Sequence, residues 1–456
     1  MDPVKDVSAL DAIVVGAGFA GLAAAERLAA AGLQIRVLEA SDRVGGRALT
    51  DYALGNGVPL ELGAQMVHGR TVVTHGWLRR FGLGTRPLRL NQHSRIVIDR
   101  KVGRYPWYTL PFHPVVGTTA TLDALYRIPK ALRSYSGPDR SLSEFLDEQN
   151  VSVATRSIVK LLNSHSYSTD PDVLGVLGPG EEERRSSEPY GFRNFQVVEG
   201  YSALSDRVAA HLGARVVRNA PVTAILRSTD GVCLRIGAPS GGAESELRAP
   251  AVIVTVSLAV LRSGAIQFDP PLPERLRSAI ARIGFGDAYA LQLRVRDGTM
   301  RRRLGNFGTL WGGTHTSFRR PRIGTGEPGE FVTAFTVGRE ARRRAGLSDD
   351  GLVAATVAEW ESAVPDGVTL GAVDGFAVHR WTTDPWVRGS YSFLPRGVGF
   401  EERQELARPI DGQLFWAGEA TDLTGHSATV AGAIASGERA AEELLVMRPT
   451  RSGTRP

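Results

Sequence analysis

The sequence predicts an α/β protein with two domains, one built on buried parallel strands alternating with helices and one of mixed α+β structure. Three observations support this fold class. The 456 residues exceed what one hydrophobic core usually holds. Near the start, a short apolar run is followed by spaced glycines and an alanine-rich stretch. Residues 284–385 instead read as alternating strands interrupted by arginine-rich loops.

The first predicted unit is a strand, a glycine turn and a helix. Asp11–Val15 is apolar and β-branched, as in a buried parallel strand, and Leu22–Ala31 has no internal glycine or proline. Gly16, Gly18 and Gly21 lie between them at the spacing of a Rossmann-type dinucleotide site, where glycines allow a tight turn, approach to pyrophosphate and helix packing. In a chain with 52 glycines, a plain flexible turn is the alternative.

A second strand strengthens the dinucleotide interpretation. Ile35–Leu38 leads into Glu39, at the position where an acidic side chain accepts hydrogen bonds from ribose hydroxyls. The run RVGGR follows, with Gly45, Gly46 and Arg47. We therefore predict an adenine dinucleotide, although the second run alone also suits an ordinary turn with a solvated arginine.

Composition excludes several classes. With 42% hydrophobic and 22% charged residues the chain is typical of globular proteins. It has no apolar run of about 18 residues, and its first residues lack a secretion signal, so we expect a cytoplasmic protein without a membrane segment. The single cysteine, Cys233, lies in an alternating apolar run and predicts a buried small side chain, with no intrachain disulfide and no metal cluster.

Nearly all the basic residues of the chain are arginines. The net charge of +6 comes from 54 Lys+Arg against 48 Asp+Glu, and with four lysines the arginines number 54 − 4 = 50. We interpret the densest cluster as a solvated face, because it lacks the interleaved aromatics of a nucleic-acid surface, and it disfavours a polycationic substrate. Its members are Arg301, Arg302, Arg303, Arg319, Arg320, Arg322, Arg339, Arg342, Arg343 and Arg344.

Two blocks near the end carry the most specific resemblance. HRWTTDPWVRGSYSFLPRG at 379–397 and LFWAGEATDLTGHSATVAGAIASGERAAEEL at 414–444, taken with the glycine motifs, resemble the flavin-containing amine oxidase family. The matches run discontinuously from residue 11 to 445. The resemblance implies the two-domain architecture of that family, with FAD and not NAD as cofactor.

The resemblance also implies which residues contact FAD. The second glycine run lies against the pyrophosphate, the loop at 61–69 passes over the flavin, and the backbone at 222 meets adenine. A tryptophan packs on the flavin ring, and the N-terminus of the last helix, beginning near residue 429, points at the pyrimidine edge. Beyond the residues of the first two strands and their turns, the matching positions are Gly63, Ala64, Gln65, Val222, Trp381, Gly418, Glu419 and Val430.

Three further residues are candidates for substrate contact. His68 matches a histidine that lines the substrate tunnel in polyamine oxidases, and Tyr391 matches one wall of the aromatic cage around the amine. The other wall falls at Thr429, so at most half a cage is present. Structural roles, as a loop histidine and a core tyrosine, are the alternatives.

Two departures from the family pattern bear on chemistry. Ser390 stands where some members carry a flavin-linking cysteine, so we expect non-covalent FAD. The lysine that holds a water beside the flavin is missing, because no lysine follows Lys160 and the matching position falls near Ala288. We therefore leave open an oxidase or a dehydrogenase that uses dioxygen slowly.

The implied reaction oxidises a C–N bond of an amine or amide, with hydride transfer to flavin and hydrogen peroxide formed from dioxygen. An α-amino acid is disfavoured because no arginine precedes Arg70 in the loop at 61–69, although an arginine from elsewhere in the fold is able to substitute. A specialised biosynthetic enzyme, a C–C desaturase resembling protoporphyrinogen or carotenoid oxidoreductases, and a flavin-binding scaffold without turnover stay open, as does a homodimer.

These matches give predicted boundaries. The FAD-binding domain takes residues 8–84, 194–283 and 386–447, the substrate domain takes 85–193 and 284–385, and 448–456 form a tail. Within the substrate domain, Leu142–Gln149 and Val153–Leu162 are amphipathic and predict a helical insertion. Residues 178–191 are polar and contain proline and glycine, so we expect a loop that acts as a lid or a linker.

Overall fold

The computed structural model divides into two compact units. Unit 1 comprises Met1–Gly46, Leu204–Ala281 and Glu401–Pro456, and unit 2 comprises Arg47–Ala203 and Arg282–Phe400. Compared with the predicted domains, residues 47–84, 194–203, 282–283 and 386–400 belong to unit 2. The structure describes residues 10–88, 94–98, 101–105, 120, 123–186, 194–237, 244–296, 298–299, 303, 309–312, 315–320 and 330–447.

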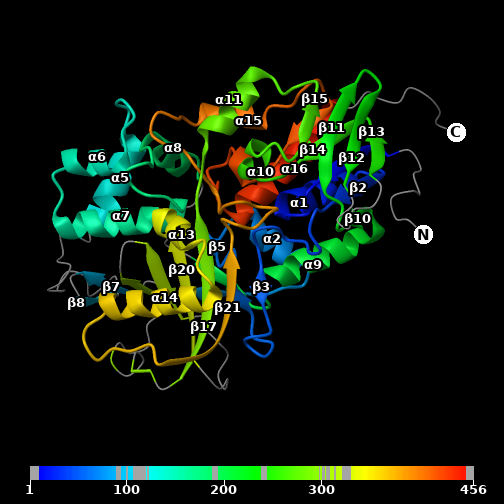
Figure 1. The fold of residues 1–456 in the computed structure, drawn as a ribbon. Helices are drawn as coiled ribbons and strands as arrows, with labels where there is room; N and C mark the ends of the chain where they lie inside the picture. Colours follow the sequence, from blue (N-terminus) through cyan, green and yellow to red (C-terminus); the bar gives the residue numbers. More distant parts are fainter. Residues whose placement is uncertain are drawn as a thin grey trace. The chain divides into compact units, whose positions relative to one another are not determined.

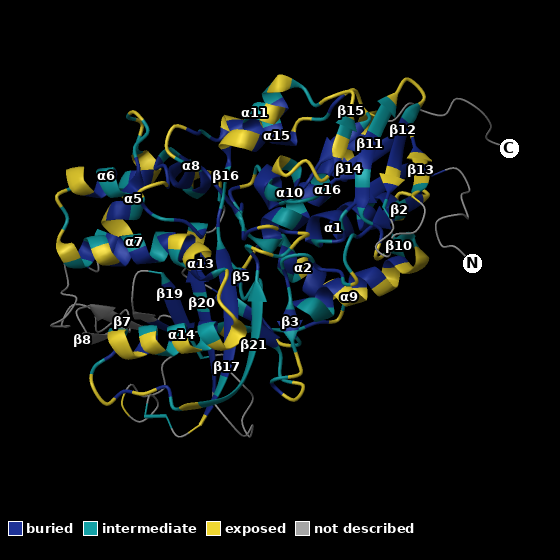
Figure 2. Cartoon of the chain, in the orientation of Figure 1, coloured by how far each residue is buried: buried dark blue, intermediate teal, exposed yellow. Residues whose placement is uncertain are grey.

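Unit 1 is built on a five-stranded sheet in the order β10-β2-β1-β14-β23, in which every neighbouring pair is parallel. Buried apolar residues fill its central strands, which appear dark blue in Figure 2. The two predicted strands are confirmed within one residue. The strands are β1 (Ala12–Val15), β2 (Ile35–Leu38), β10 (Val216–Val217), β14 (Ala251–Val254) and β23 (Leu414–Trp416).

The other elements of unit 1 are helices and a second sheet, of order β13-β12-β11-β15 (Figure 1). The helix predicted after the glycine turn is α1, which begins three residues earlier than expected. The unit boundary falls within α9. The strands are β11 (Val222–Ser228), β12 (Gly231–Ile236), β13 (Ser245–Ala249) and β15 (Gln267–Asp269), and the helices are α1 (Phe19–Ala30), α9 (Tyr201–Leu212), η3 (Gly213–Arg215), α10 (Leu258–Arg262), α11 (Glu274–Arg282), α15 (Glu401–Ala407), η4 (Glu419–Thr421) and α16 (Val430–Met447).

Helices α1 and α16 pack closely because glycine stands at their contact. A Cβ added at Gly437 would lie 2.1 Å from the carbonyl oxygen of Ala20 and 3.0 Å from the Cβ of Ala23. Ala20 and Ala23 of α1 are buried, and neither carries a large side chain that could give way there. The last helix is thereby held against the helix that follows the first glycine turn.

Unit 2 contains a seven-stranded sheet in the order β21-β17-β20-β19-β18-β7-β8, in which only the β18–β7 pair is parallel. Smaller sheets join β5, β9 and β6, β3 and β4, and β16 and β22. The strands are β3 (Thr50–Asp51), β4 (Leu60–Glu61), β5 (Val67–His68), β6 (Thr85–Leu88), β7 (Ser94–Ile98), β8 (Lys101–Tyr105), β9 (Asn194–Val197), β16 (Gly284–Phe285), β17 (Ala288–Arg296), β18 (Thr309–Gly312), β19 (Thr316–Arg319), β20 (Glu330–Val337), β21 (Ala372–Arg380) and β22 (Ser392–Phe393).

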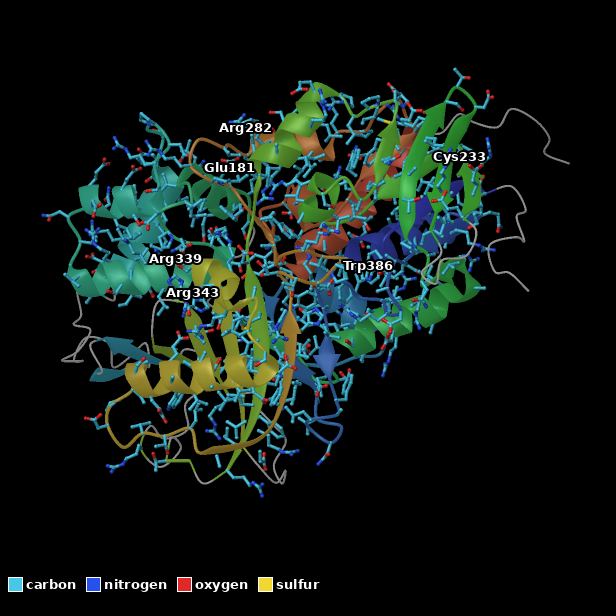
Figure 3. All side chains as sticks on the ribbon, viewed as in Figure 1. Glu181, Cys233, Arg282, Arg339, Arg343 and Trp386 are labelled. Carbon is cyan, nitrogen blue, oxygen red and sulfur yellow. The ribbon has the colours of Figure 1, made fainter. Side chains whose placement is uncertain are left out.

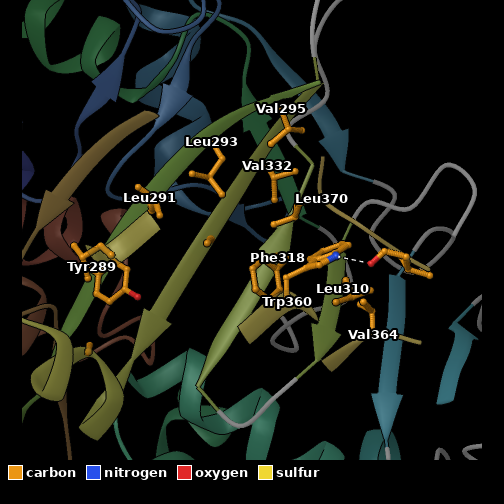
Figure 4. Close-up of a cluster of buried hydrophobic side chains, with 14 residues drawn as sticks. Tyr289, Leu291, Leu293, Val295, Leu310, Phe318, Val332, Trp360, Val364 and Leu370 are labelled. Carbon is orange, nitrogen blue, oxygen red and sulfur yellow. Dashed lines mark hydrogen bonds between the residues drawn. The ribbon is translucent and has the colours of Figure 1, made fainter. Parts of the chain in front are cut away.

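One face of this sheet forms the core of unit 2 (Figure 4). Alternate residues of β17, beginning with Tyr289, point to that face, as strand geometry requires. Trp360 of α14 is fully buried there, packs edge-on against Phe318 at 5.0 Å and donates its indole N–H to the carbonyl oxygen of Val368. The intervening residues of β17, such as Gln292, therefore face the opposite side of the sheet.

The helical insertion predicted for unit 2 is confirmed, but the loop predicted at 178–191 is wrong over its first half. Residues to 185 form a helix, because Pro179 stands in its first turn, where its missing N–H costs nothing, and Glu181 pairs with two arginines one turn later. Gly180 packs against the backbone of Leu132, since a Cβ would lie 2.5 Å from that carbonyl oxygen. Residues 187–191 lie outside the described part. The helices are α2 (Val73–Arg80), η2 (Asp123–Arg127), α5 (Ile128–Ser134), α6 (Leu142–Glu148), α7 (Val153–Tyr167), α8 (Leu177–Arg185), α13 (Gly338–Arg344) and α14 (Asp349–Ala363).

The arginine cluster does not lie on loops between strands as predicted. Four of its members belong to α13, where Arg339 and Arg343 project outward (Figure 3). Ion pairs join Arg339 to Asp170 at 3.2 Å, Arg342 to Asp287 at 2.5 Å, Arg343 to Glu340 at 2.6 Å and Arg344 to Glu359 at 2.9 Å. Arg301, Arg302 and Arg322 lie outside the described residues, as do residues 448–456. No described helix is both long and apolar enough to cross a membrane.

Replacing Gly437 with alanine should separate α1 from α16. The new methyl group meets backbone at 2.1 Å, and such overpacking costs about 1–3 kcal/mol or more. Gly76→Ala is the matched control, because Gly76 also lies within a helix and a Cβ there meets nothing within 4 Å. It should be neutral or stabilise by about 0.5–1 kcal/mol. Urea unfolding measures both, and equal stability of the two variants would contradict the close packing.

Candidate functional site

The predicted cofactor residues of unit 1 gather at one edge of its parallel sheet. Gly16 directly follows β1, Glu39 follows β2, Thr255 follows β14, and Gly418 comes shortly after β23. Because all the strands are parallel, their carboxyl ends meet at the same edge. Ligands of doubly wound folds bind at this edge, outside the carboxyl ends of the strands.

The first glycine turn is closed by backbone contacts that only glycine permits. Gly16 has φ +102°, and a Cβ there would lie 2.6 Å from the Oγ1 atom of Thr255. A Cβ on Gly21 would lie 1.9 Å from the carbonyl oxygen of Gly16. Gly18 is less crowded, since a Cβ there would make only an ordinary contact with the Cα of Gly46 at 3.9 Å, and the residue keeps intermediate exposure. The backbone at Gly18 is therefore accessible to a ligand.

The second glycine run lies directly against the first. Gly45 donates its N–H to the carbonyl oxygen of Ala17 at 2.9 Å and forms a β-bridge with Gly18. Gly45 and Gly46 have φ +95° and +56°. α1 begins at Phe19, so its first N–H groups, which have no partners within the helix, face the same turn. The arrangement suits a pyrophosphate.

Glu39 is buried and organises the neighbouring loops. Its Oε2 atom accepts a hydrogen bond from the N–H of Ala17 at 2.7 Å, and its Oε1 atom accepts from the N–H and hydroxyl of Ser41 at 2.9 and 2.8 Å. The N–H of Ala220 donates to the carbonyl oxygen of Glu39 at 2.8 Å, which brings the segment leading to Val222 alongside. An ionised carboxylate has about four acceptor positions, so capacity for ribose hydroxyls is left.

At the other end of the edge, Gly418 and Glu419 stabilise the approach to α16. Gly418 has φ +127°, and its N–H donates to the hydroxyl of Ser436 at 2.9 Å. The buried Glu419 carboxylate accepts from the N–H of Ala428 at 2.9 Å. Both predicted residues therefore shape this turn, while their contact with a cofactor stays a prediction.

The structure shows a structural role for Thr429 beside the predicted one. Its hydroxyl accepts a hydrogen bond from the N–H of Gly432 at 3.1 Å and donates to the carbonyl oxygen of His426 at 2.6 Å. Thr429 thus caps α16, whose first residue is Val430. The capped N-terminus fits the predicted dipole contact with a flavin edge, and substrate contact by Thr429 stays a prediction.

The loop at 61–65 in unit 2 is fixed from several sides. Trp381 donates its indole N–H to the carbonyl oxygen of Leu62 at 2.8 Å, and the side chain of Gln292 donates to that of Glu61 at 2.6 Å. The N–H of Ala64 bonds to the carbonyl oxygen of Arg47 at 3.1 Å. The same oxygen lies 2.1 Å from where a Cβ on Gly63 would stand. The structure therefore brings Trp381 and Arg47 into contact with the loop that contains Gly63 and Ala64.

The candidate substrate residues of unit 2 are anchored separately. His68 shares a hydrogen bond between its Nδ1 atom and the Oδ1 atom of Asn194 at 2.7 Å. The Tyr391 hydroxyl donates to the carbonyl oxygen of His165 at 2.5 Å. Arg47 donates to the carbonyl oxygen of Ser390 at 2.7 Å, next to Tyr391. The structure thus joins Arg47 to the residue that precedes the predicted tyrosine.

Ala288, the position of the missing lysine, is the first residue of β17 and is buried. Its side chain shares a sheet face with Gln292, which contacts the loop at 61–65. The neighbouring Asp287 is paired with Arg342 and is thus occupied. The side chain of a lysine at 288 would therefore lie on the face of the sheet where Gln292 contacts the predicted flavin loop.

Two buried titratable groups lie near these residues. Burial raises the pKa of Glu61 to about 8, although its carboxyl group accepts hydrogen bonds from the Thr50 hydroxyl and the N–H of Tyr201. Burial lowers the pKa of His165 to about 4. Both groups are therefore largely uncharged at neutral pH.

Sequence reasoning missed Thr255 and Gln292. Thr255 donates to the carbonyl oxygen of Val15 at 2.8 Å and sets the turn at Gly16. A hydroxyl residue directly after the apolar run 252–254 was the available signal. Gln292 had no local signal, because its partner Glu61 lies 231 residues away.

Comparison with a family model identifies the fold. Residues 19–445 match the model of flavin containing amine oxidoreductases. Probable polyamine oxidase 4 of Arabidopsis thaliana is 27% identical over 93% of this chain and 86% of its own length. Lysine-specific histone demethylase 2 of Homo sapiens is 28% identical over 96% of this chain, which spans 54% of that protein.

Among solved structures, a putrescine oxidase with putrescine bound has a TM-score of 0.81 and 22% identity, covering 96% of this chain and 99% of its own. This likeness concerns the fold. The predicted two-domain FAD amine oxidase architecture is confirmed by it together with the family match.

Replacing Glu61 with glutamine should change how stability depends on pH. The native carboxyl group holds a proton up to about pH 8, while its unperturbed pKa is 4.5, so the free energy of unfolding falls as the pH rises between these values. The fall is on the order of 4 kcal/mol. Glutamine keeps an acceptor for the N–H of Tyr201 and places its NH2 group beside the Thr50 hydroxyl, which must then accept, but it does not titrate.

Urea unfolding of both proteins at pH 5, 6.5 and 8 measures the effect. The Glu61→Gln variant should gain on the wild type as the pH rises, with the largest difference at pH 8. Parallel pH profiles would show that the carboxyl group is ionised in the native state.

Proposed function

The chain belongs to the family of flavin-containing amine oxidoreductases and is a flavin-dependent amine oxidase or dehydrogenase, and from this premise we propose that it oxidises a C–N bond of an amine with non-covalent FAD. The observation that carries the proposal is the agreement between the family match along residues 19–445 and the glycine-lined sheet edge of unit 1. The relatives named polyamine oxidase and putrescine oxidase support an amine as substrate.

The residues of unit 1 fit an adenine dinucleotide. The open backbone at Gly18 and the N-terminus of α1 would bind the pyrophosphate, and Glu39 would accept from ribose hydroxyls. Val222 would meet adenine through its backbone, and the N-terminus of α16 would stabilise negative charge at one edge of the ring. Ser390 has no thiol, which supports non-covalent binding.

Bound FAD would accept the hydride released from the α C–H bond while the nitrogen lone pair forms the imine, and dioxygen would take up the two electrons with two protons as hydrogen peroxide. The residues of unit 2 position the amine. Tyr391, held by His165, contacts the reacting amine, and His68, oriented by Asn194, contacts the substrate along its path. Water then hydrolyses the imine. A cytoplasmic location and dioxygen as acceptor belong to the same proposal.

The buried Ala288 supports a dehydrogenase with slow use of dioxygen over a fast oxidase. A lysine is the family's means of holding a water beside the flavin, and none of the residues after Lys160 is a lysine. The half-reaction with the amine does not depend on that residue in this proposal. The two half-reactions are therefore separable by experiment.

Anaerobic mixing of the yellow protein with primary, secondary and polyamines tests the proposed function. At least one amine should bleach the flavin absorbance, and admission of air should restore it slowly. Heat precipitation should release FAD into the supernatant. Flavin that no amine bleaches would contradict the proposal and favour a desaturase or a scaffold.

Replacing Ala288 with lysine should accelerate reoxidation by dioxygen by about tenfold, equivalent to about 1.4 kcal/mol of barrier. Ala288→Met is the control of similar length without charge and should not accelerate it. Stopped-flow reoxidation measures both rates, and anaerobic reduction by the amine serves as the internal reference. Equal reoxidation rates in the two variants would show that the lysine was not the missing element.

A further inference from the structure

One member of the arginine cluster differs from the others. Arg319 ends β19, and protein surrounds its side chain closely enough that burial lowers its pKa to about 10. The residue as a whole is of intermediate exposure, while its Nε atom is buried. Its Nη1 atom donates to the side-chain oxygen of Gln65. Within the described residues, its Nε atom and the Nε2 atom of Gln65 have no hydrogen-bond partner.

Arg319 also has no carboxylate partner among the described ion pairs. This contrasts with Arg339, Arg342, Arg343 and Arg344, each of which pairs with an acidic side chain of unit 2. All four arginines of α13, including the buried Arg344, are thus paired with a carboxylate, whereas Arg319 has no such partner among the described residues. An enclosed guanidinium without a counter-ion is costly, and a bound anion would offset that cost.

The sheet places Arg319 beneath the predicted flavin loop. Phe318 packs in the core with Trp360, so the next residue of β19 faces the opposite side. Register aligns Arg319 with Thr333 of β20, and Thr333 with Gln292 of β17. The two ends of this row contact the loop at 61–65, through Gln65 and through the carbonyl oxygen of Glu61.

The neighbourhood does not neutralise the guanidinium. His165 of α7 has its ring 6.4 Å from that of Phe335, on the same face of the sheet. Burial, with the charge of Arg319 as a further cause, lowers the pKa of His165 to about 4, so it is neutral. The carbonyl oxygen of His165 accepts from Tyr391, the proposed amine contact. His165 thus accepts a hydrogen bond from Tyr391 through its backbone and is influenced electrostatically by Arg319.

We propose that Arg319, with the amide of Gln65, binds a carboxylate group of the substrate, so that the substrate is an amine carrying a carboxylate, such as an amino acid, and not a polyamine. This inference rests on the proposed function. A guanidinium binds a carboxylate through charge-assisted, often bidentate hydrogen bonds, whereas the additional ammonium groups of a polyamine would meet a like charge. The loop at 61–69 has no arginine before Arg70, and Arg319 supplies one from β19.

Pairs of compounds that differ only in the carboxylate test the inference. The holoprotein is mixed anaerobically with phenylalanine or phenethylamine, lysine or cadaverine, and ornithine or putrescine, and flavin bleaching is followed against concentration. In at least one pair the amino acid should half-saturate bleaching at a concentration at least tenfold lower than the amine. Arg319→Gln should raise that concentration by about 10- to 100-fold for the amino acid and by less than threefold for the amine.

Two further variants serve as controls. Arg319→Lys keeps the charge without the planar fork and should recover part of the loss. Arg343→Gln removes an exposed arginine of the same cluster and should leave the half-saturating concentration of both compounds unchanged. Flavin content and melting temperature are measured for each variant. Where Arg319→Gln loses flavin, the comparison is made with Arg319→Lys.

The outcomes separate this inference from the proposed function. If the amine half-saturates bleaching at an equal or lower concentration than the amino acid in every pair, the carboxylate subsite is overturned and the proposed function stands. An equal loss for both members of a pair in Arg319→Gln would also overturn it. If no compound bleaches the flavin, binding of phenylacetate, read from the flavin spectrum, decides: binding that requires Arg319 supports the subsite, and no binding overturns it.

Discussion

The closest backbone approach in unit 1 is the constraint on which its arrangement depends. The Cα of Gly21 stands so near the carbonyl oxygen of Gly16 that a Cβ would lie 1.9 Å away. This contact sets α1 directly on the end of β1, and Gly437 sets α16 on α1 in the same way. Because both contacts involve backbone atoms, no side-chain rearrangement relieves them. The helix N-terminus and the ends of the parallel strands are thereby fixed at one edge of the sheet.

Buried polar groups play the corresponding part in unit 2. Gln292 and Trp381 satisfy successive carbonyl oxygens of the loop at 61–65, and Arg319 contacts its last side chain. Each donor comes from a strand or a strand end of the large sheet, which is rigid because Trp360 and its neighbours fill the other face. A loop whose backbone is bonded to a packed sheet has little freedom to move. The loop is therefore a fixed part of the candidate site.

The sequence predicted the elements whose signal is local. β1, β2, α1 and α7 were found from apolar runs, glycine spacing and amphipathic periodicity. The helix α8 was missed because its glycines were interpreted as flexible, whereas they allow close packing on Leu132 and Leu394, a tertiary property. For the candidate site, the glycine and acidic positions followed from spacing. Partners far apart in the chain, such as Gln292 and Glu61, left no mark in either segment.

In proteins that share a fold, individual side chains determine which ligand is bound. The chain shares its fold with a putrescine oxidase at 22% identity, a likeness that concerns the fold and not the ligand. A putrescine molecule carries two ammonium groups at neutral pH, and an enclosed guanidinium without a counter-ion repels both. In unit 2, His165, whose pKa the charge of Arg319 helps to lower, is held neutral by burial and supplies no negative charge. The electrostatics of this sheet face are therefore consistent with the proposed carboxylate group of the substrate.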